Sequence, residues 1–551
     1  MTNRAQYRQR ILQLMADVVP QKLETFDEVT GRFITEPNGP IAPGARPEDL
    51  GWAVTNQDAI HALAVLFIEG PEPWQRNPEL LDVIGRAGDA IRDFQDDAGQ
   101  VEFVKADGSK WGMTYMPWTN YAWLEAWAML RAHLDPARAA RWEEGLTLAH
   151  DGQARELASG HVHNIPCWKA MSCWRAGQLM NRDDWQQAGA EMLARCVETQ
   201  HPDGYWPEHL GPTNGYNRVY LHAVGLYHIF SGDDSVLPAI EAATRYAQAF
   251  TYPDGSMVET IDGRQKYHSW INPSGLVSMT LVPQGRRYVR YLLDLPRFAE
   301  ALSNPRVSTP WSNSLASHIA SLYQYMHFGD EAPIHLDEAA FTEVYSDLAV
   351  VKREAPWFGC LSAFVCPTGA SRWGLDRQQF VSLWHEDAGL LIGGGNSRNQ
   401  PEWATFVSNG RFVPDSGEVA GEAISLRYGG TTCSLDLRFE GGAAVIEVGA
   451  EGGSAINHLA LPLHRGEIIR TELGDVVETG DRALLYMPRE MGEWVQIRGF
   501  RIELPPCAQL AWPTVPFNPY AIDGSAGFGS EAALLSAPVE GQPVVWRISR
   551  P

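Results

Sequence analysis

The sequence predicts an α+β multidomain chain, in which an N-terminal α/α toroid of helical hairpins precedes a C-terminal antiparallel β-sandwich. Three observations support this prediction. Up to about residue 335, apolar residues recur at three- and four-residue spacing, which is typical of amphipathic helices. Related Asp-Gly motifs recur about every 50 residues in the same region. From about residue 340, helical spacing gives way to alternating segments punctuated by glycine. We therefore predict domains at 1–335 and 340–551.

The helical pattern is clearest in four segments. They are DAIHALAVLFIEG (58–70), YAWLEAWAMLRAHL (121–134), DDWQQAGAEMLARCVETQ (183–200) and SVLPAIEAATRYAQAFT (235–251). Clusters of Pro, Gly and Asp separate them, as expected of helix ends. The sequence thus predicts a succession of helices joined by short connections.

The repeat is carried by Asp-Gly pairs at Asp151, Asp203 and Asp254, with a weaker copy around Asp97. A period of about 50 residues holds two helices and two connections, and such a repeat indicates a solenoid or a closed ring. About six hairpins fit into the first domain, which favours a toroid. We expect each Asp-Gly pair to form a turn, because both residues suit turn backbones.

The second domain shows strand patterns. FVSLWHEDAGLLIGGGN (380–396), TTCSLDLRFEGGAAVIEVGA (431–450) and EWVQIRGFRIELP (493–505) are rich in β-branched residues and alternate apolar with polar positions. No long helical pattern returns after them. The interpretation is a set of antiparallel sheets stacked in a sandwich.

Composition and charge argue against some classes of function. The 551 residues carry a formal net charge of -23, so a broad nucleic-acid surface is not expected. No apolar run reaches the length of a membrane span. The N-terminal stretch lacks the apolar core of a secretory signal, and the seven cysteines form no CxxC pair. We therefore expect reduced thiols and a cytoplasmic location.

Reactive residue types stand in register with the repeat. Thirteen residues after the three Asp-Gly aspartates come Asn164, Tyr216 and Tyr267. His209 precedes Tyr216 by seven positions, and Arg264 precedes Tyr267 by three. Each of the three registered positions should open an inner helix of the toroid. The sequence therefore predicts that these side chains face one mouth of the ring.

This set of residues suits β-elimination at a uronic acid. The C5 proton of the sugar becomes acidic only when the neighbouring carboxylate is stabilised, which we assign to Asn164 and Arg264. Either His209 or Tyr216 would remove the proton, and a tyrosine can protonate the departing O4. No cofactor or metal is needed for this reaction. We predict a lyase that acts on an acidic oligosaccharide or polysaccharide and leaves a 4,5-unsaturated uronyl product.

Three motifs carry a resemblance to a known family. HNIPCWKAMSCW, DGYWPEHLGPTNGY and DGRQKY resemble, in this order, the Asn, His–Tyr and Arg segments of the toroid-type polysaccharide lyases. This family includes the hyaluronate and chondroitin AC lyases and the heparinase II/III-like enzymes. The resemblance implies a toroid with a large β-sandwich, and Asn164, His209, Tyr216 and Arg264 as catalytic residues. The seven-residue gap between His209 and Tyr216 is shorter than in the hyaluronate group, so the substrate stays open.

Further residues are candidates for substrate binding, because aromatic rings stack on sugars and histidines donate hydrogen bonds. They are His163, Trp206, Tyr220, Tyr267, Trp111, Tyr115, Trp118 and His385. The alternative for each ring is packing in the core.

Other functions are compatible with the sequence. A glycoside hydrolase acting on unsaturated uronyl oligosaccharides would use two carboxylates, such as Asp203 with Asp254 or Glu208 with Glu259. A non-catalytic carbohydrate-binding protein would need the aromatic residues alone.

Several of the chosen residues also have structural alternatives. Asn164 suits the N-cap of the helix that follows it. Arg264 has acidic neighbours with which it could form an ion pair. A structural metal site in the sandwich could be formed by His385, Asp387, His458 and His464, although their spacing matches no compact ligand motif.

Overall fold

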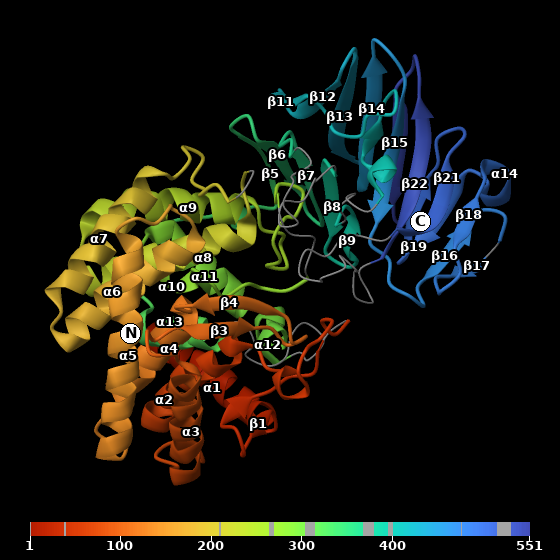
Figure 1. Ribbon diagram of the computed structural model, residues 1–551. Coiled ribbons are helices and arrows are strands. Elements are labelled where there is room, and N and C mark those ends of the chain that lie inside the picture. Colours follow the sequence, from red (N-terminus) through yellow and green to blue (C-terminus); the bar gives the residue numbers. More distant parts are fainter. Residues whose placement is uncertain are drawn as a thin grey trace. The chain divides into compact units, whose positions relative to one another are not determined.

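The structure is a computed structural model that describes residues 2–37, 40–208, 211–263, 269–303, 315–366, 379–394, 400–474, 476–514 and 531–551. The chain divides into two compact units (Figure 1). The first comprises Met1–Trp206, Gly215–Arg245 and Trp270–Pro333, and the second Pro207–Asn214, Tyr246–Ser269 and Ile334–Pro551. The first is helical and the second is built of antiparallel sheets, which confirms the predicted fold class.

The helices of the first unit fall into two groups by burial. The inner helices, buried over most of their surface, are α2 (Ala59–Glu69), α4 (Pro117–Leu130), α6 (Asn164–Met180), α8 (Asn214–Ser231), α10 (Leu276–Met279) and α13 (Leu315–Tyr325). The outer helices, each with an exposed face, are α1 (Thr2–Leu23), α3 (Pro78–Phe94), α5 (Pro136–Leu157), α7 (Asp183–Glu198), α9 (Leu237–Ala249), α11 (Pro283–Asp294) and α12 (Pro296–Ser303). The two groups alternate along the chain as far as α11, as hairpins of a toroid require, and a second outer helix, α12, then precedes α13.

Short elements complete the two units. Two small hairpins in the first unit are β1 (Phe26–Asp27) with β2 (Arg32–Phe33), and β3 (Val101–Val104) with β4 (Lys110–Thr114). Turns of 3₁₀ helix lie at Pro47–Asp49, Val54–Asp58, Asp234–Val236, His335–Asp337 and Pro401–Trp403. In the part of the chain that the structure describes, no helix is both long and apolar enough to cross a membrane.

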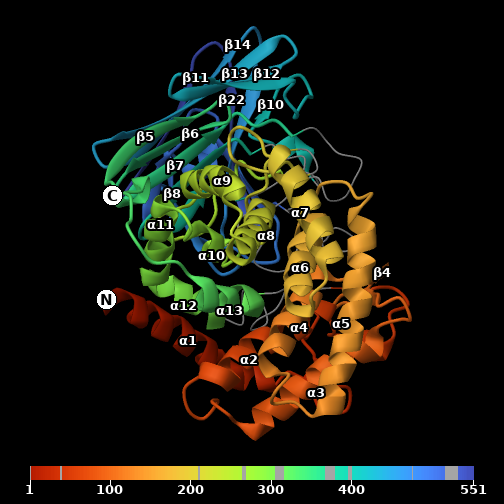
Figure 2. The ribbon, with the colours of Figure 1, turned by 90° about the vertical axis from the view of Figure 1, so that its left-hand side faces the viewer.

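The inner helices close into a ring. The last of them, α13, meets the first, α2, through a hydrogen bond of 2.8 Å between the Ser317 hydroxyl and His61. Figure 2 shows α2 and α13 side by side. Further around the ring, Trp168 of α6 donates to the Val219 carbonyl of α8 at 2.9 Å, and Ser278 of α10 donates to the His222 carbonyl of α8. The helical unit is therefore a closed toroid.

The inner helices also run parallel to one another. Residues early in one helix contact residues early in the next, as Trp118 of α4 does with Trp168 of α6, whose ring centroids lie 5.9 Å apart. Late residues meet late residues, as Glu125 of α4 does with Arg175 of α6 and Tyr325 of α13. The N-terminal ends of these helices therefore share one mouth of the ring, and their C-terminal ends share the other.

The Asp-Gly repeat is confirmed only in part. Gly204 and Gly255 have φ of +89° and +83°, so Asp203 and Asp254 do belong to turns. The interpretation of Asp151 as a turn residue is wrong, because Asp151 and Gly152 lie inside α5. Gly152 is needed there because a Cβ atom would come within 1.9 Å of the Tyr115 ring.

Asp151 instead joins two outer helices. Its carboxylate accepts hydrogen bonds from the Trp185 indole at 2.9 Å and from Arg182 at 2.8 Å, both from the start of α7. Asp89 of α3 accepts from the Trp142 indole of α5 in the same way, at 2.9 Å. An outer-helix aspartate that holds the tryptophan of the next outer helix is thus a repeated feature of the toroid.

In the described part of the second unit, the strands form three larger antiparallel sheets. One has the order β5-β6-β7-β8-β9, with β5 (Ala340–Tyr345), β6 (Ala349–Glu354), β7 (Trp357–Ser362), β8 (Val381–His385) and β9 (Gly389–Ile392). Another has the order β10-β15-β22-β21-β18, with β10 (Phe406–Val407), β15 (Ala455–Leu461), β18 (Leu484–Tyr486), β21 (Gln509–Thr514) and β22 (Ala532–Val539).

The largest sheet has the order β11-β12-β13-β14-β23-β20-β19-β16-β17. Its strands are β11 (Ser416–Ala420), β12 (Ala423–Tyr428), β13 (Thr431–Glu440), β14 (Ala443–Glu451), β16 (Ile468–Thr471), β17 (Val476–Glu478), β19 (Trp494–Ile497), β20 (Phe500–Glu503) and β23 (Val544–Ser549), and a short helix, α14 (Pro488–Met491), precedes β19. The pairing of Ile446 with Trp546 places two buried side chains on one face of the sheet. One continuous apolar core joins all three sheets, as in a sandwich.

Candidate active site

Asn164 is the first residue of the inner helix α6. His163, with φ -157° and ψ 179°, takes the N-cap position just before it, and the His163 carbonyl accepts from the amide of Cys167. Asn164 is 4% exposed. The prediction that Asn164 opens an inner helix is confirmed. The N-cap position falls on His163, so Asn164 is not the N-cap residue that the structural alternative made it.

Tyr216 lies in the first turn of the inner helix α8, and its side chain is partly exposed. This position also confirms the prediction from the repeat. The neighbouring Asn217 is fully buried, and its side-chain oxygen accepts from the Trp206 amide at 3.1 Å. Tyr216 is therefore the better placed of the two for contact with a ligand.

The first turns of α6 and α8 lie next to each other. Trp168, one turn after Asn164, donates to the carbonyl of Val219, which is three residues after Tyr216. Because the two helices are parallel and joined at this level, Asn164 and Tyr216 stand at the same mouth of the toroid. An amide and a phenol are thus held at the N-terminal ends of adjacent helices.

Beneath this mouth lies a buried group of aromatic rings. The Trp168 indole stacks on the imidazole of His222 with centroids 5.1 Å apart, and His222 is 4.5 Å from His318. Burial, together with His318 and His61, keeps the pKa of His222 well below its ordinary value. These imidazoles are therefore neutral, and they add no positive charge beneath the mouth.

The tautomer of His222 follows from its surroundings. The amide of Gly275 donates to Nδ1 of His222 at 3.0 Å, so the proton of the neutral ring resides on Nε2. Neither Nε2 of His222 nor Nε2 of His318 has a hydrogen-bond partner within the described ranges. Sequence reasoning missed this pair, because a single histidine in an apolar helix gives no pattern that separates it from core packing.

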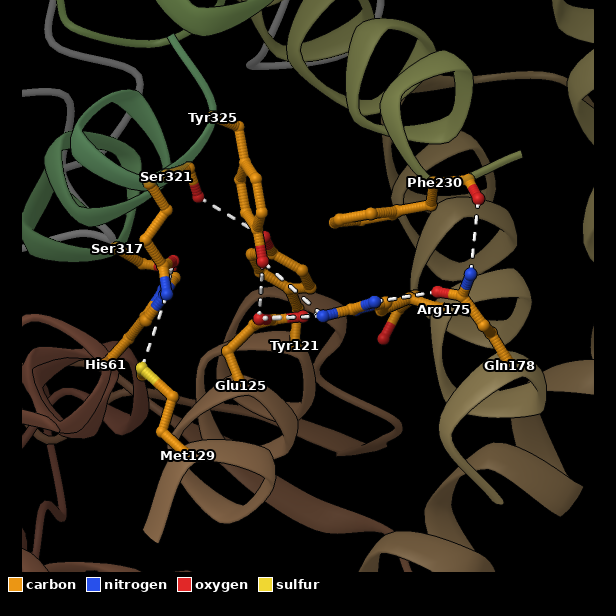
Figure 3. A network of polar contacts seen from close by, with 12 residues as sticks. His61, Tyr121, Glu125, Met129, Arg175, Gln178, Phe230, Ser317, Ser321 and Tyr325 are labelled. Carbon is orange, nitrogen blue, oxygen red and sulfur yellow. Dashed lines mark hydrogen bonds and ion pairs between the residues drawn. The ribbon is translucent and has the colours of Figure 1, made fainter. Parts of the chain in front are cut away.

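An ion-pair network joins the inner helices α4, α6 and α13 near their C-terminal ends (Figure 3). The Arg175 guanidinium donates to Glu125 at 2.7 Å, and the Tyr325 hydroxyl donates to the same carboxylate at 2.9 Å. Burial alone would raise the pKa of Glu125, but Arg175 beside it holds that pKa below its ordinary value. The charged pair is therefore satisfied within the protein.

Two of the predicted sugar-stacking rings are accessible. Trp111, on strand β4, is 41% exposed and lies edge-on to Phe103, with the ammonium of Lys105 4.5 Å from its ring centre. Trp118, in the first turn of α4, is partly exposed and adjoins Trp168. His163, the N-cap residue of α6, is also partly exposed. These three residues remain candidates for substrate binding.

Four other predicted contacts have covered rings, and we leave them out of the proposed site. Trp206 and Tyr220 are each 1% exposed and stack on each other at 5.4 Å. Tyr115 is buried against Gly152 of α5. His385, in the second unit, is buried between Trp357 and Phe500, each 4.5 Å away. Packing explains all four positions.

The remaining predicted residues are His209, Arg264 and Tyr267, which lie outside the described residues. The structure therefore describes two of the four predicted catalytic side chains, Asn164 and Tyr216.

The carboxylates suggested for a hydrolase have structural contacts. Asp254 accepts from the amide and hydroxyl of Ser256 within its turn. Glu259 is 2% exposed and accepts from the Tyr252 hydroxyl at 2.9 Å and the Gly394 amide at 2.6 Å. Asp203 adjoins His201 in its own turn. Glu208, 6% exposed, forms a short backbone bridge with Gly211.

The structure offers no support for the proposed structural metal. Among the described residues, no group of three or more His, Cys, Asp or Glu side chains could hold a metal ion. His385 lies 3.8 Å from Asp387, whereas the His458 imidazole contacts the carbonyl of Ala404 and the backbone amide of His464 donates to Glu467.

Comparison with known proteins gives a likeness in fold. No protein-family model and no curated protein matches the sequence. Among solved structures, a mutant of chondroitin AC lyase from Streptomyces coelicolor A3 is similar over 98% of this chain and 79% of its own, with a TM-score of 0.55 and 12% identity.

Two further solved structures have lower scores. Heparan sulfate lyase from Pedobacter heparinus has a TM-score of 0.44 and 12% identity over 90% of this chain and 76% of its own. An unsaturated glucuronyl hydrolase from Streptococcus agalactiae has a TM-score of 0.37 and 10% identity, over 59% of this chain and 82% of its own. The chain thus has the toroid-and-sandwich fold found in chondroitin AC lyase.

Proposed function

We propose that this protein is a lyase that cleaves a uronate-containing glycan by β-elimination. The observation that carries the proposal is the pairing of Asn164 and Tyr216 in the first turns of two adjacent, parallel inner helices. The likeness of the fold to chondroitin AC lyase supports it.

In the proposed reaction, the Asn164 amide donates a hydrogen bond to the uronate carboxylate. This bond strengthens as charge moves onto the carboxylate in the transition state, so it lowers the barrier rather than only tightening binding. We assign the cationic partner of the carboxylate to Arg264. The imidazoles of His222 and His318 are neutral, so they do not supply this positive charge, and we assign it to a residue at the mouth.

Proton transfer then completes the elimination. Tyr216 or His209 takes the C5 proton, the C5–H electron pair forms the C4=C5 double bond, and the C4–O4 bond breaks. O4 leaves with a proton supplied by Tyr216 or by water. This elimination requires no added oxidant, reductant or metal.

The alternative of a hydrolase requires an acid and a base that are free to act. Glu259 is buried with hydrogen bonds to both oxygens, and Asp254 holds its own turn. These contacts favour structural roles for the two carboxylates, and so favour elimination over hydrolysis.

A product assay separates the two reactions. The protein is incubated with a panel of uronic-acid oligosaccharides and polymers, and absorbance in the near ultraviolet reports the conjugated double bond. We expect a rise in absorbance with at least one substrate, and its loss in the variants Arg264→Ala and His209→Ala. New reducing ends without a rise in absorbance would instead establish hydrolysis.

A further inference from the structure

A cavity of about 300 Å³ lies in the helical unit, beside the C-terminal end of α13. Its lining comes from α1, from α11 and from the segment after α13, and includes Arg4, Arg286, Arg290, His327, Phe328 and Glu331. Since α13 is parallel to α4 and α6, this cavity lies at the end of the helices opposite Asn164 and Tyr216. It is therefore separate from the candidate active site.

The cavity is positively charged although the whole chain carries a net charge of -23. Among its lining side chains, three arginines stand against a single glutamate. Arg290 pairs with Glu331 at 2.7 Å. Burial lowers the pKa of His327, and His228, Arg286 and Arg4 lower it further, which is the effect expected of a positive local field.

Arg286 is held in place by neutral groups. Its Nε donates to the Asp330 carbonyl at 2.8 Å, and its Nη1 donates to the carbonyls of Thr280 and Leu281 at 3.0 and 3.1 Å. Within the described ranges no carboxylate pairs with it. The guanidinium is thus fixed in position while its charge is not neutralised, an arrangement that favours an anion.

Gly329 and the exposed Arg4 leave room for a ligand beside the Arg286 guanidinium. A Cβ atom added to Gly329 would lie 3.6 Å from Nε of Arg286, in ordinary contact, so glycine keeps this side of the guanidinium uncovered. Arg4, which is exposed, lies 5.5 Å from the centre of the Phe328 ring and has no ion pair in the described part of the chain. Tyr7, Met326 and Phe328 supply apolar wall.

We propose that this cavity binds a small organic anion, a carboxylate or phosphate group on a body the size of a monosaccharide. The charge requires an anionic group, and the apolar wall suits a carbon skeleton. A volume of about 300 Å³ is at the lower end of small-molecule sites, so an oligosaccharide is too large. The proposal does not depend on the activity proposed for the mouth.

Calorimetric titration of the full-length protein tests the proposal with three probes. Glucuronate carries a carboxylate, glucose 6-phosphate carries a phosphate, and glucose is the neutral control. We expect saturable binding of at least one anion and none of glucose, and the anion that binds identifies the preferred group. No binding of either anion at millimolar concentration, or equal binding of glucose, would overturn the proposal.

Three variants locate the binding. Arg4→Gln should weaken it about tenfold, as expected for loss of a charge-assisted hydrogen bond. Gly329→Val should abolish it by filling the space beside Arg286. Arg10→Gln removes an equal charge from α1 but does not line the cavity, so it should change binding by less than about twofold.

Tyr216→Phe must leave this binding unchanged, because Tyr216 lies at the other end of the inner helices. Loss of binding in Tyr216→Phe, or equal effects of Arg4→Gln and Arg10→Gln, would show that the anion binds elsewhere and would refute the site.

Discussion

The two ends of the inner helices each carry a tyrosine, but in different surroundings. At the C-terminal end, Glu125, Arg175 and Tyr325 satisfy one another, and the two charges are paired. At the N-terminal end, Asn164 and Tyr216 stand in the first turns of α6 and α8, where Tyr216 is partly exposed. The comparison separates a stabilising end from the end that we propose to be reactive, and it predicts that substitutions at the two ends will have different consequences.

The largest effect on stability is expected at the paired end. Glu125→Ala removes the buried carboxylate that pairs with the partly buried Arg175, which should lower the free energy of unfolding by about 3 kcal/mol. Glu144→Ala is the control, because Glu144 is exposed and its ion pair with Arg92 should contribute at most about 1 kcal/mol. Urea unfolding measures both. A loss below about 1 kcal/mol for Glu125→Ala would contradict the stabilising role given to this end.

The reactive end is tested by a pair of amides on one helix. Asn164→Ala should reduce turnover of a uronide substrate by roughly 10²–10³-fold, as expected for loss of a donor to a developing charge. Gln178→Ala, near the C-terminal end of α6, removes an amide that donates to the Phe230 carbonyl at 3.3 Å, and it should leave turnover unchanged.

Stability must be followed in both amide variants, because Asn164 is buried and Gln178 bonds to the Phe230 carbonyl. Equal activity of the two folded variants would mean that Asn164 has no special role in the reaction.

The sequence alone predicts some of these features and not others. The positions of Asn164 and Tyr216 in the first turns of inner helices were predictable, because the inner helices recur about every 50 residues. Asp151–Gly152 was misinterpreted, because the need for glycine there comes from the Tyr115 ring, which is remote in sequence. No local pattern carries such a contact.

The sequence also did not predict the ion-pair network of Glu125 and Arg175. Glu125 and Arg175 are 50 residues apart, and each reads as an ordinary charge on a helix. Only the closure of the ring brings them together. Likewise His222 and His318 meet because α8 and α13 are neighbours in the toroid, although almost 100 residues separate them in the chain.

The buried histidines between the two ends predict a smaller, pH-dependent effect. Burial, followed by His61, lowers the pKa of His318 from 6.5 to about 3. Between these values the unfolded chain holds a proton on His318 that the folded chain does not. Stability should therefore fall as the pH decreases from 6.5 towards 3, by up to about 1.4 kcal/mol per pH unit.

The variant His318→Gln isolates this contribution. It loses the contact with the Ser274 hydroxyl, so its stability at neutral pH should be lower, but its stability should decline less steeply with acid. Urea unfolding at about pH 7 and about pH 5 measures the slope. An identical slope in the variant would mean that His318 is protonated to the same extent in the folded and unfolded chains.

The most direct test of the central claim compares two tyrosines on α8. Tyr216 lies in its first turn, whereas Tyr227 lies near its end and donates to Asp233 at 3.0 Å. With a uronide that yields the unsaturated product, Tyr216→Phe should lower turnover by about 10²-fold or more. Tyr227→Phe should retain turnover within about twofold of the parent. If the folded Tyr216→Phe variant were as active as Tyr227→Phe, Tyr216 would not transfer the proton, and the assignment of the reactive end would be wrong.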